Sequence, residues 1–87
     1  MTAGAPAEVL VRLPAALAPL FPDAPRLVSL PAESVAGVIE ALEARWPGMR
    51  DRLCDERPAI RRHINVFVGG RRVGLDARLA PGADVYI

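Results

Sequence analysis

Residues 34–46 form a long stretch in which apolar residues recur with the period of an α-helix, and this helix limits which folds the rest of the chain can adopt. Its apolar residues recur at offsets of 3, 4, 7 and 11. Ser34 stands directly before them, where its hydroxyl can accept hydrogen bonds from the free amides of a first helical turn. Pro47 forbids an ordinary continuation. The stretch therefore predicts one main amphipathic helix. Its apolar positions are Val35, Val38, Ile39, Leu42 and Trp46.

Alternating apolar and polar residues on both sides of this helix predict short strands. Residues 8–13 place Val9 and Val11 on one face, with Leu10 and Arg12 on the other. Residues 26–30 follow closely enough in sequence that we expect the two strands to pair antiparallel. The remaining predicted elements are strands at 63–68, 71–73 and 84–87, a hairpin turn at Gly69-Gly70, a short helical piece at 47–54, and loops at 15–25 and 55–62.

The order of these elements, β-β-α-β-β-β, predicts the α+β class. A helix of this length can cover one face of a four- to five-stranded mixed sheet and leave the other face open. The layout is a β-grasp (ubiquitin-like) roll with one main helix packed on one face. We expect a single domain at 8–87 after a flexible leader at 1–7. Its predicted core is Val9, Val11, Val28, Val35, Val38, Ile39, Leu42, Ile64, Val66, Val68, Leu79 and Val85.

Composition narrows the class of protein. With 52% hydrophobic and 24% charged residues, the chain is not a simple disordered segment. Prolines interrupt the apolar segments well before the ~20 residues needed to span a membrane. The first residues lack the basic start and long apolar run of a signal peptide. We therefore expect a cytoplasmic protein that does not bind membranes.

The charged and nucleophilic residues exclude several functions. The net charge of +1 is too balanced for bulk electrostatic binding of nucleic acid, and all eleven basic residues are arginine. A single Cys and a single His can form neither an internal disulfide nor a protein-only zinc site. No nucleophile, base and orienting group occur together. We therefore expect no catalytic residue, no metal and no cofactor, and we do not expect an enzyme.

Two stretches resemble a known family. Residues 64–73, Ile-Asn-Val-Phe-Val-Gly-Gly-Arg-Arg-Val, are similar to the third strand and hairpin of the small sulfur carriers of the MoaD/ThiS type. Residues 77–87, Ala-Arg-Leu-Ala-Pro-Gly-Ala-Asp-Val-Tyr-Ile, resemble the approach of those carriers to their C-terminus. Residues 61–68 look most like the carriers of the CysO type, which are paired with cysteine synthase.

The resemblance implies that the chain carries sulfur for cofactor (molybdopterin or thiamin) or cysteine biosynthesis. In this family an E1-like adenylating enzyme activates the carboxylate of a C-terminal Gly-Gly tail, which becomes a thiocarboxylate and reacts with a sulfur-acceptor enzyme. The sequence ends at Ile87, and Gly69-Gly70 is internal. We expect such a tail beyond Ile87. The alternative is a tailless β-grasp interaction module without sulfur chemistry.

The open sheet face is the predicted partner-binding site. Leu10, Phe67 and Tyr86 are expected there on adjacent strands with Arg12 beside them, followed by Ile87 at the end of the last strand. Contiguous exposed apolar side chains usually mark an interface. The alternative is scattered exposure, which is common for single apolar residues.

Three other features each have a functional interpretation and a simpler, purely structural one. The pairs Arg61-Arg62 and Arg71-Arg72 could bind phosphate or nucleic acid, although separated pairs are more often solvated strand ends. Cys54 could be a reactive thiol, although a lone cysteine beside an apolar residue is more often packed. Trp46, at the end of the helical stripe, is expected in the core.

Overall fold

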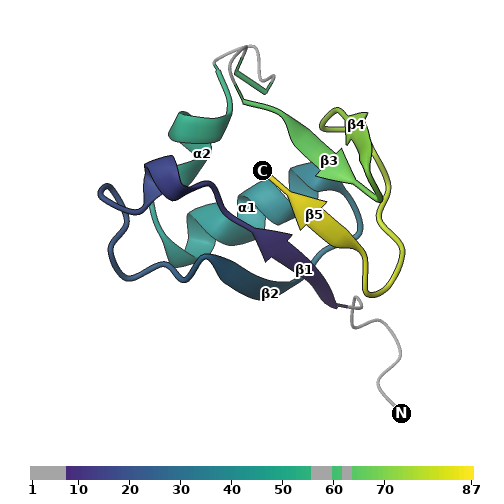
Figure 1. Ribbon diagram of the computed structural model, residues 1–87, viewed down its shortest axis with the longest axis horizontal. Helices are drawn as coiled ribbons and strands as arrows, with labels where there is room; N and C mark the ends of the chain where they lie inside the picture. The colour runs from purple at the N-terminus through teal and green to yellow at the C-terminus, as the bar shows by residue number, and fades with distance from the viewer. Residues whose placement is uncertain (1–7, 56–59, 62–63) are drawn as a thin grey trace.

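The computed structural model describes residues 8–55, 60–61 and 64–87. They form a five-stranded mixed sheet with one main helix on one face, which confirms the predicted β-grasp (Figure 1). The predicted leader at 1–7 lies outside the described residues. The sheet order is β2-β1-β5-β3-β4. The elements are β1 (Glu8–Arg12), the 3-10 helix η1 (Ala15–Leu17), β2 (Leu27–Pro31), α1 (Val35–Arg45), α2 (Met49–Leu53), β3 (Val66–Val68), β4 (Arg71–Val73) and β5 (Asp84–Tyr86).

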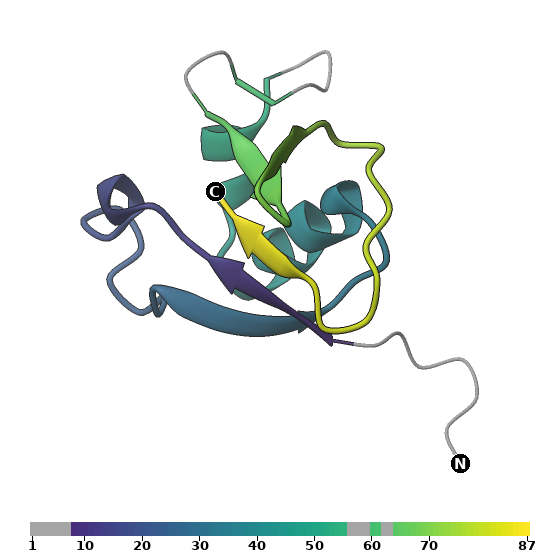
Figure 2. The same ribbon diagram turned by 45° about the vertical axis from the view of Figure 1, so that its right-hand side comes forward.

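Strand β5 lies in the middle of the sheet, between β1 and β3 (Figure 2). It runs parallel to β1 and antiparallel to β3, whereas β1 and β2 pair antiparallel as predicted. The Leu10 amide donates to the Ala83 carbonyl at 2.9 Å, and the Ile87 amide donates to the Arg12 carbonyl at 3.0 Å. The last described residue is therefore hydrogen-bonded to the first strand.

The start of α1 is stabilised by its N-cap and by hydrogen bonds to the segment between β4 and β5. Ser34 caps the helix as predicted, because its Oγ accepts a hydrogen bond from the Gly37 amide at 3.0 Å. The amides of Val35 and Ala36 donate to the carbonyls of Ala77 and Leu75, each at 3.0 Å. These bonds satisfy first-turn donors that an isolated helix leaves free. They also hold the segment between β4 and β5 against the helix.

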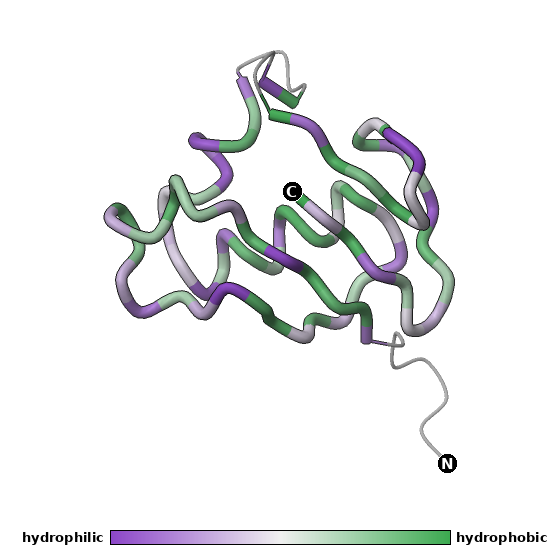
Figure 3. Tube along the Cα trace, in the orientation of Figure 1, coloured by the Kyte–Doolittle hydropathy of each residue, from purple (hydrophilic) through white to green (hydrophobic). Residues whose placement is uncertain are grey.

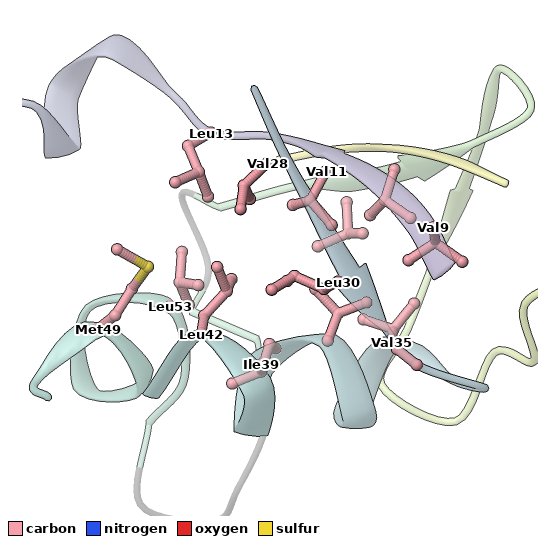
Figure 4. Packing of buried hydrophobic residues seen from close by; sticks show 14 of the residues in the cluster. Val9, Val11, Leu13, Val28, Leu30, Val35, Ile39, Leu42, Met49 and Leu53 are labelled. Carbon is pink, nitrogen blue, oxygen red and sulfur yellow. The ribbon is translucent and has the colours of Figure 1, made fainter. Parts of the chain in front are cut away.

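The core lies between α1 and the inner face of the sheet (Figure 4). Ten of the twelve predicted core residues are buried, including the whole predicted stripe of α1 except Trp46. Trp46 is only partly buried, because it ends the helix as its C-cap. Ile64 and Val68 were also expected in the core and are only partly buried. Val68 adjoins the exposed Gly69-Gly70 turn, and Ile64 precedes the strand.

Seven buried residues were absent from the predicted core list. Several belong to short elements that cover one end of the core between α1 and the sheet. Leu17 comes from η1, whereas Met49 and Leu53 come from α2. Their burial depends on how these short pieces fold back, which periodicity within each piece does not reveal. The seven residues are Leu13, Leu17, Leu30, Ala32, Met49, Leu53 and Cys54.

The predicted strand at 63–68 is shorter in the structure, where β3 covers Val66–Val68. Both neighbours of β3 are short, since β4 pairs with three of its residues and β5 with two. Ile64 and Asn65 find no partner strand in the part of the chain that the structure describes, and the Ile64 amide instead donates to the Arg61 carbonyl. Of the predicted strand and the loop before it, residues 56–59 and 62–63 lie outside the described residues.

Glu43, near the end of α1, holds the first turn of α2. Its carboxylate accepts hydrogen bonds from the Arg50 amide at 2.9 Å and from the Gly48 amide at 3.1 Å. Gly48 is the N-cap of α2 and has a φ of 98°, a value that side-chain-bearing residues rarely adopt. The amide bonds, first from Arg50 and then from Gly48, lower the pKa of Glu43 below its ordinary value.

Leu42→Ala should lower the free energy of unfolding by about 2–4 kcal/mol, because Leu42 is fully buried and its removal leaves a cavity. Chemical denaturation measures the loss. Leu20→Ala makes the same change at an exposed position and should stay within about 0.5 kcal/mol of the wild type. Equal losses for the two variants would contradict the core described above.

Glu43→Gln should remove a pH-dependent part of the stability. Because folding lowers the pKa of Glu43, its contribution is complete above the ordinary value of 4.5 and is lost as the pH falls through the folded value. The stability difference between wild type and Glu43→Gln should therefore shrink as the pH falls below about 4.5. Thermal melts from pH 7 to pH 3 measure it. A difference that stays constant over this range would overturn the assignment.

Candidate docking surface

One row of side chains crosses the outer face of the sheet through all five strands. The strand register places Arg72 opposite Phe67, Phe67 opposite Tyr86, Tyr86 beside Arg12, and Arg12 opposite Leu27. Neighbouring strands are about 4.8 Å apart, so these side chains are close neighbours. Phe67, Tyr86 and Leu27 are 39%, 48% and 47% exposed. We call Leu27, Arg12, Tyr86, Phe67 and Arg72 the cross-sheet row.

Leu10 lies beside the cross-sheet row, two residues before Arg12 on the same face of β1. It is exposed, and its strand partners are Ser29 on β2 and Asp84 on β5. Along β5, hydrophilic and hydrophobic residues alternate (Figure 3), and the burial of these residues alternates with them, since Asp84 and Tyr86 are exposed and Val85 is buried. The outer face therefore combines exposed apolar side chains with a few charged ones.

Arg12 is the central charged residue of the cross-sheet row. Its guanidinium carbon lies 4.9 Å from the centre of the Tyr86 ring, in cation–π contact. Its Nη2 is 3.9 Å from a carboxylate oxygen of Asp84, and both side chains are about half exposed. An ion pair this long and this exposed contributes little to stability. The Arg12 Nε is buried and has no hydrogen-bond partner among the residues that the structure describes.

A hollow of about 290 Å³ opens at the end of the sheet where β1 and β5 finish. Two arginines, Arg12 and Arg26, stand among its otherwise apolar walls. The Arg26 Nε donates to the Leu13 carbonyl at 3.2 Å. The hollow therefore combines positive charge with apolar surface, directly beside the end of the last strand. Its lining residues are Arg12, Leu13, Pro14, Arg26, Leu27, Tyr86 and Ile87.

The structure brings the predicted partner-binding residues together. Leu10, Phe67 and Tyr86 share the outer face on β1, β3 and β5, and Arg12 contacts Tyr86. Ile87 is partly buried against the core, with its amide bonded to β1. That these residues bind a partner stays a prediction.

Leu27, Arg26 and Arg72 belong to the same surface but were not among the predicted site residues. Leu27 and Arg72 complete the cross-sheet row at its two ends, on β2 and β4. Arg26 is part of this surface because it lines the hollow at the end of β1 and β5. Alternation would have placed each of them on a strand face. Only the register between strands shows which of them share a row.

A larger hollow, about 420 Å³, lies away from this surface, between the loop after η1 and the region of α2. Its wall includes Leu20, Phe21, Gly48 and Arg61. The Arg61 Nε is engaged locally, since it donates to the Asp51 carbonyl at 2.8 Å. This hollow shares no lining residue with the hollow at the end of β1 and β5, so we do not count it as part of the candidate docking surface.

The remaining sequence candidates show no reactive constellation. Cys54 is buried, 6% exposed, as the simpler interpretation expected. Arg71 and Arg72 are exposed on β4, whereas Arg62 and His63 lie outside the described residues. Among the residues that the structure describes, no group of three or more His, Cys, Asp or Glu side chains could hold a metal ion. No helix in the described part of the chain is long and apolar enough to cross a membrane.

The chain is similar to several solved structures. It is 30% identical to CysO of Mycobacterium tuberculosis over 90% of this chain and 93% of that one, with a TM-score of 0.81. It is 28% identical to a chain in the BexX/CysO complex of Amycolatopsis orientalis, with 90% of each chain covered and a TM-score of 0.81. No protein-family model matches the chain, and neither does any curated protein.

A third structure shows how widely the fold is shared. Small archaeal modifier protein 1 of Haloferax volcanii is 24% identical, with 92% of this chain and 93% of that one covered and a TM-score of 0.77. At this identity the likeness concerns the fold alone.

Cys54 should react slowly with a thiol reagent in the folded protein. Burial, and secondly the neighbouring Asp55, raise the pKa of the Cys54 thiol above its ordinary value of 9.0, so little thiolate is present at neutral pH. Labelling at pH 7 should be much faster in denaturant, where the thiol is accessible. Equal labelling rates in the folded and unfolded states would contradict the packed position of this side chain.

Proposed function

The chain belongs to the ubiquitin-like small sulfur carriers of the MoaD/ThiS type, and on that premise we propose that it carries sulfur as a thiocarboxylate on a Gly-Gly tail following Ile87. The observation that carries the proposal is the match to CysO at 30% identity over nearly the whole of both chains. CysO is a small carrier rather than a catalyst. We accordingly propose a carrier role here, in the cytoplasm.

The proposed chemistry takes place at the end of the tail. An E1-like adenylating enzyme joins the terminal carboxylate to AMP from ATP, with release of pyrophosphate. Sulfide then attacks the acyl carbon, AMP leaves, and one oxygen of the original carboxylate has been replaced by sulfur. Glycines suit such a tail because a chain without side chains can enter a narrow active site. The thiocarboxylate is then used by an acceptor enzyme of cofactor or cysteine biosynthesis.

We propose that both enzymes dock on the outer sheet face through Leu10, Arg12, Phe67, Tyr86 and Ile87. Three of these side chains are exposed apolar groups on adjacent strands, and such surfaces commonly form interfaces. Their row also lies beside the end of β5, from which the tail would lead. A CysO chain occurs in complex with BexX, which supports a protein partner for this chain as well.

The natural full-length protein, incubated with ATP, its adenylating enzyme and sulfide, should gain the mass difference between sulfur and oxygen. Intact-protein mass spectrometry detects this change. A form ending at Ile87 is the control and should gain nothing, because its carboxylate is carried by a branched residue bonded to β1. A gene without Gly-Gly after Ile87, or a mass gain by the control form, would instead favour an interaction module without sulfur chemistry.

Phe67→Asp should abolish binding of the adenylating enzyme and leave the melting temperature almost unchanged. The side chain is 39% exposed and points away from α1, so a charge there disrupts an apolar contact without entering the core. Calorimetric titration and a thermal melt measure the two effects. Leu20→Ala, at an exposed position away from the sheet face, should bind normally. Unfolding of Phe67→Asp, or unchanged binding, would refute this docking surface.

A further inference from the structure

The hollow at the end of β1 and β5 has the character of a receptor for one negative charge. We propose that it receives a carboxylate side chain, flanked by apolar residues, from the adenylating enzyme that docks on the outer sheet face. The proposal names the partner chemistry of the proposed docking surface, and it rests on that proposed function for the identity of the enzyme. Arg12 and Arg26 would hold the carboxylate, while Leu27 and Tyr86 would contact its apolar neighbours.

The first argument is the state of Arg12. Its Nε–H is excluded from water and finds no acceptor in the described part of the chain, although nearly all buried donors in proteins are hydrogen-bonded. Within the described residues its one ionic contact is with Asp84, and this contact is 3.9 Å long. A carboxylate can take two parallel hydrogen bonds from one guanidinium. A rotation of the Arg12 side chain that exposes its Nε–H would give a bound carboxylate a donor that has no partner among the described residues of the free protein.

The second argument is the charge around the hollow. Arg26 is anchored through its Nε to the Leu13 carbonyl and has no ion pair with any described residue. The walls beside it are apolar, and Arg26 itself is exposed, so an incoming carboxylate can reach it. The hollow is therefore lined by two arginine side chains, and the one ionic contact that either makes within the described residues is the weak one between Arg12 and Asp84.

The same charges favour a carboxylate over a phosphate. Asp84 is the acidic residue nearest to Arg12, and it would repel a doubly charged phosphate more strongly than a single negative charge. Leu27 and Tyr86 offer contact to apolar side chains rather than to a sugar–phosphate backbone. The two exposed apolar side chains, Leu27 and Tyr86, flank Arg12 in the cross-sheet row. A partner residue of matching chemistry is an Asp or Glu with apolar neighbours.

A direct test observes the Arg12 Nε–H by nuclear magnetic resonance while a peptide is added. The probe is acetyl-Leu-Glu-Leu-amide, and the matched control is acetyl-Leu-Gln-Leu-amide, which has the same shape without the charge. The Glu peptide should shift the Arg12 Nε–H signal downfield and slow its exchange with water. The Gln peptide should not, and the Nε–H of Arg72, at the far end of the cross-sheet row, should not respond.

Equal responses to the two peptides, or no response of Arg12 to the Glu peptide, would overturn the proposal. So would a stronger response to inorganic phosphate, which would indicate a general anion site. This measurement needs no partner enzyme. A protein that forms no thiocarboxylate but shows the expected Arg12 shift would refute the proposed function and leave the carboxylate site standing.

A second test uses the absence of lysine from the chain. Arg12→Lys or Arg26→Lys introduces one side-chain amine, which a carbodiimide can join to a carboxylate in contact with it, with loss of one water. With the adenylating enzyme bound, both variants should form an amide to an Asp or Glu of that enzyme, identified by peptide mass spectrometry. The control Arg45→Lys, on α1 at the opposite face of the sheet, should form none. Conjugation through Arg45→Lys alone, or a stable complex without conjugation at the hollow, would overturn the proposal.

Discussion

Burial of the apolar stripe of α1 against the inner face of the sheet is the contact on which the other features depend. Val35, Val38, Ile39 and Leu42 are almost completely buried there. Because the helix occupies one face, alternation along each strand leaves every second side chain on the other face. The outer surface is thus a direct consequence of helix packing. The bonds from Val35 and Ala36 to the segment before β5 extend this dependence, since they fix the path by which β5 enters the sheet.

Much of this fold could be predicted from the sequence, because the strongest signals are local. The helical period of residues 34–46, the Ser34 cap and the strand alternation each concern residues near one another in the chain, and the structure confirms them. Features that depend on residues far apart in the chain were harder to predict from the sequence. The length of β3 is set by its neighbours, and the burial of Met49 depends on how α2 folds back.

The candidate docking surface could be predicted in part. Alternation identified Leu10, Phe67 and Tyr86 as outward-facing, and the order of strands in a β-grasp brought them together. It could not place Leu27 and Arg72 in the same row, because a shift of one residue in register would move either to the opposite face. The unpartnered Nε of Arg12 depends on the packing of a single side chain, for which no sequence pattern exists.

The parallel pairing of β1 and β5 has a mechanical consequence. A force that pulls the start of β1 away from the end of β5 is directed along both strands and in opposite senses. The hydrogen bonds between them, among them those joining Leu10 to Ala83 and Ile87 to Arg12, then bear the load together in shear. An antiparallel hairpin pulled at its open end would instead separate one bond at a time. Traction on the C-terminal end, with the N-terminal end held, therefore loads the hydrogen bonds between β1 and β5 together, so that several must break at once.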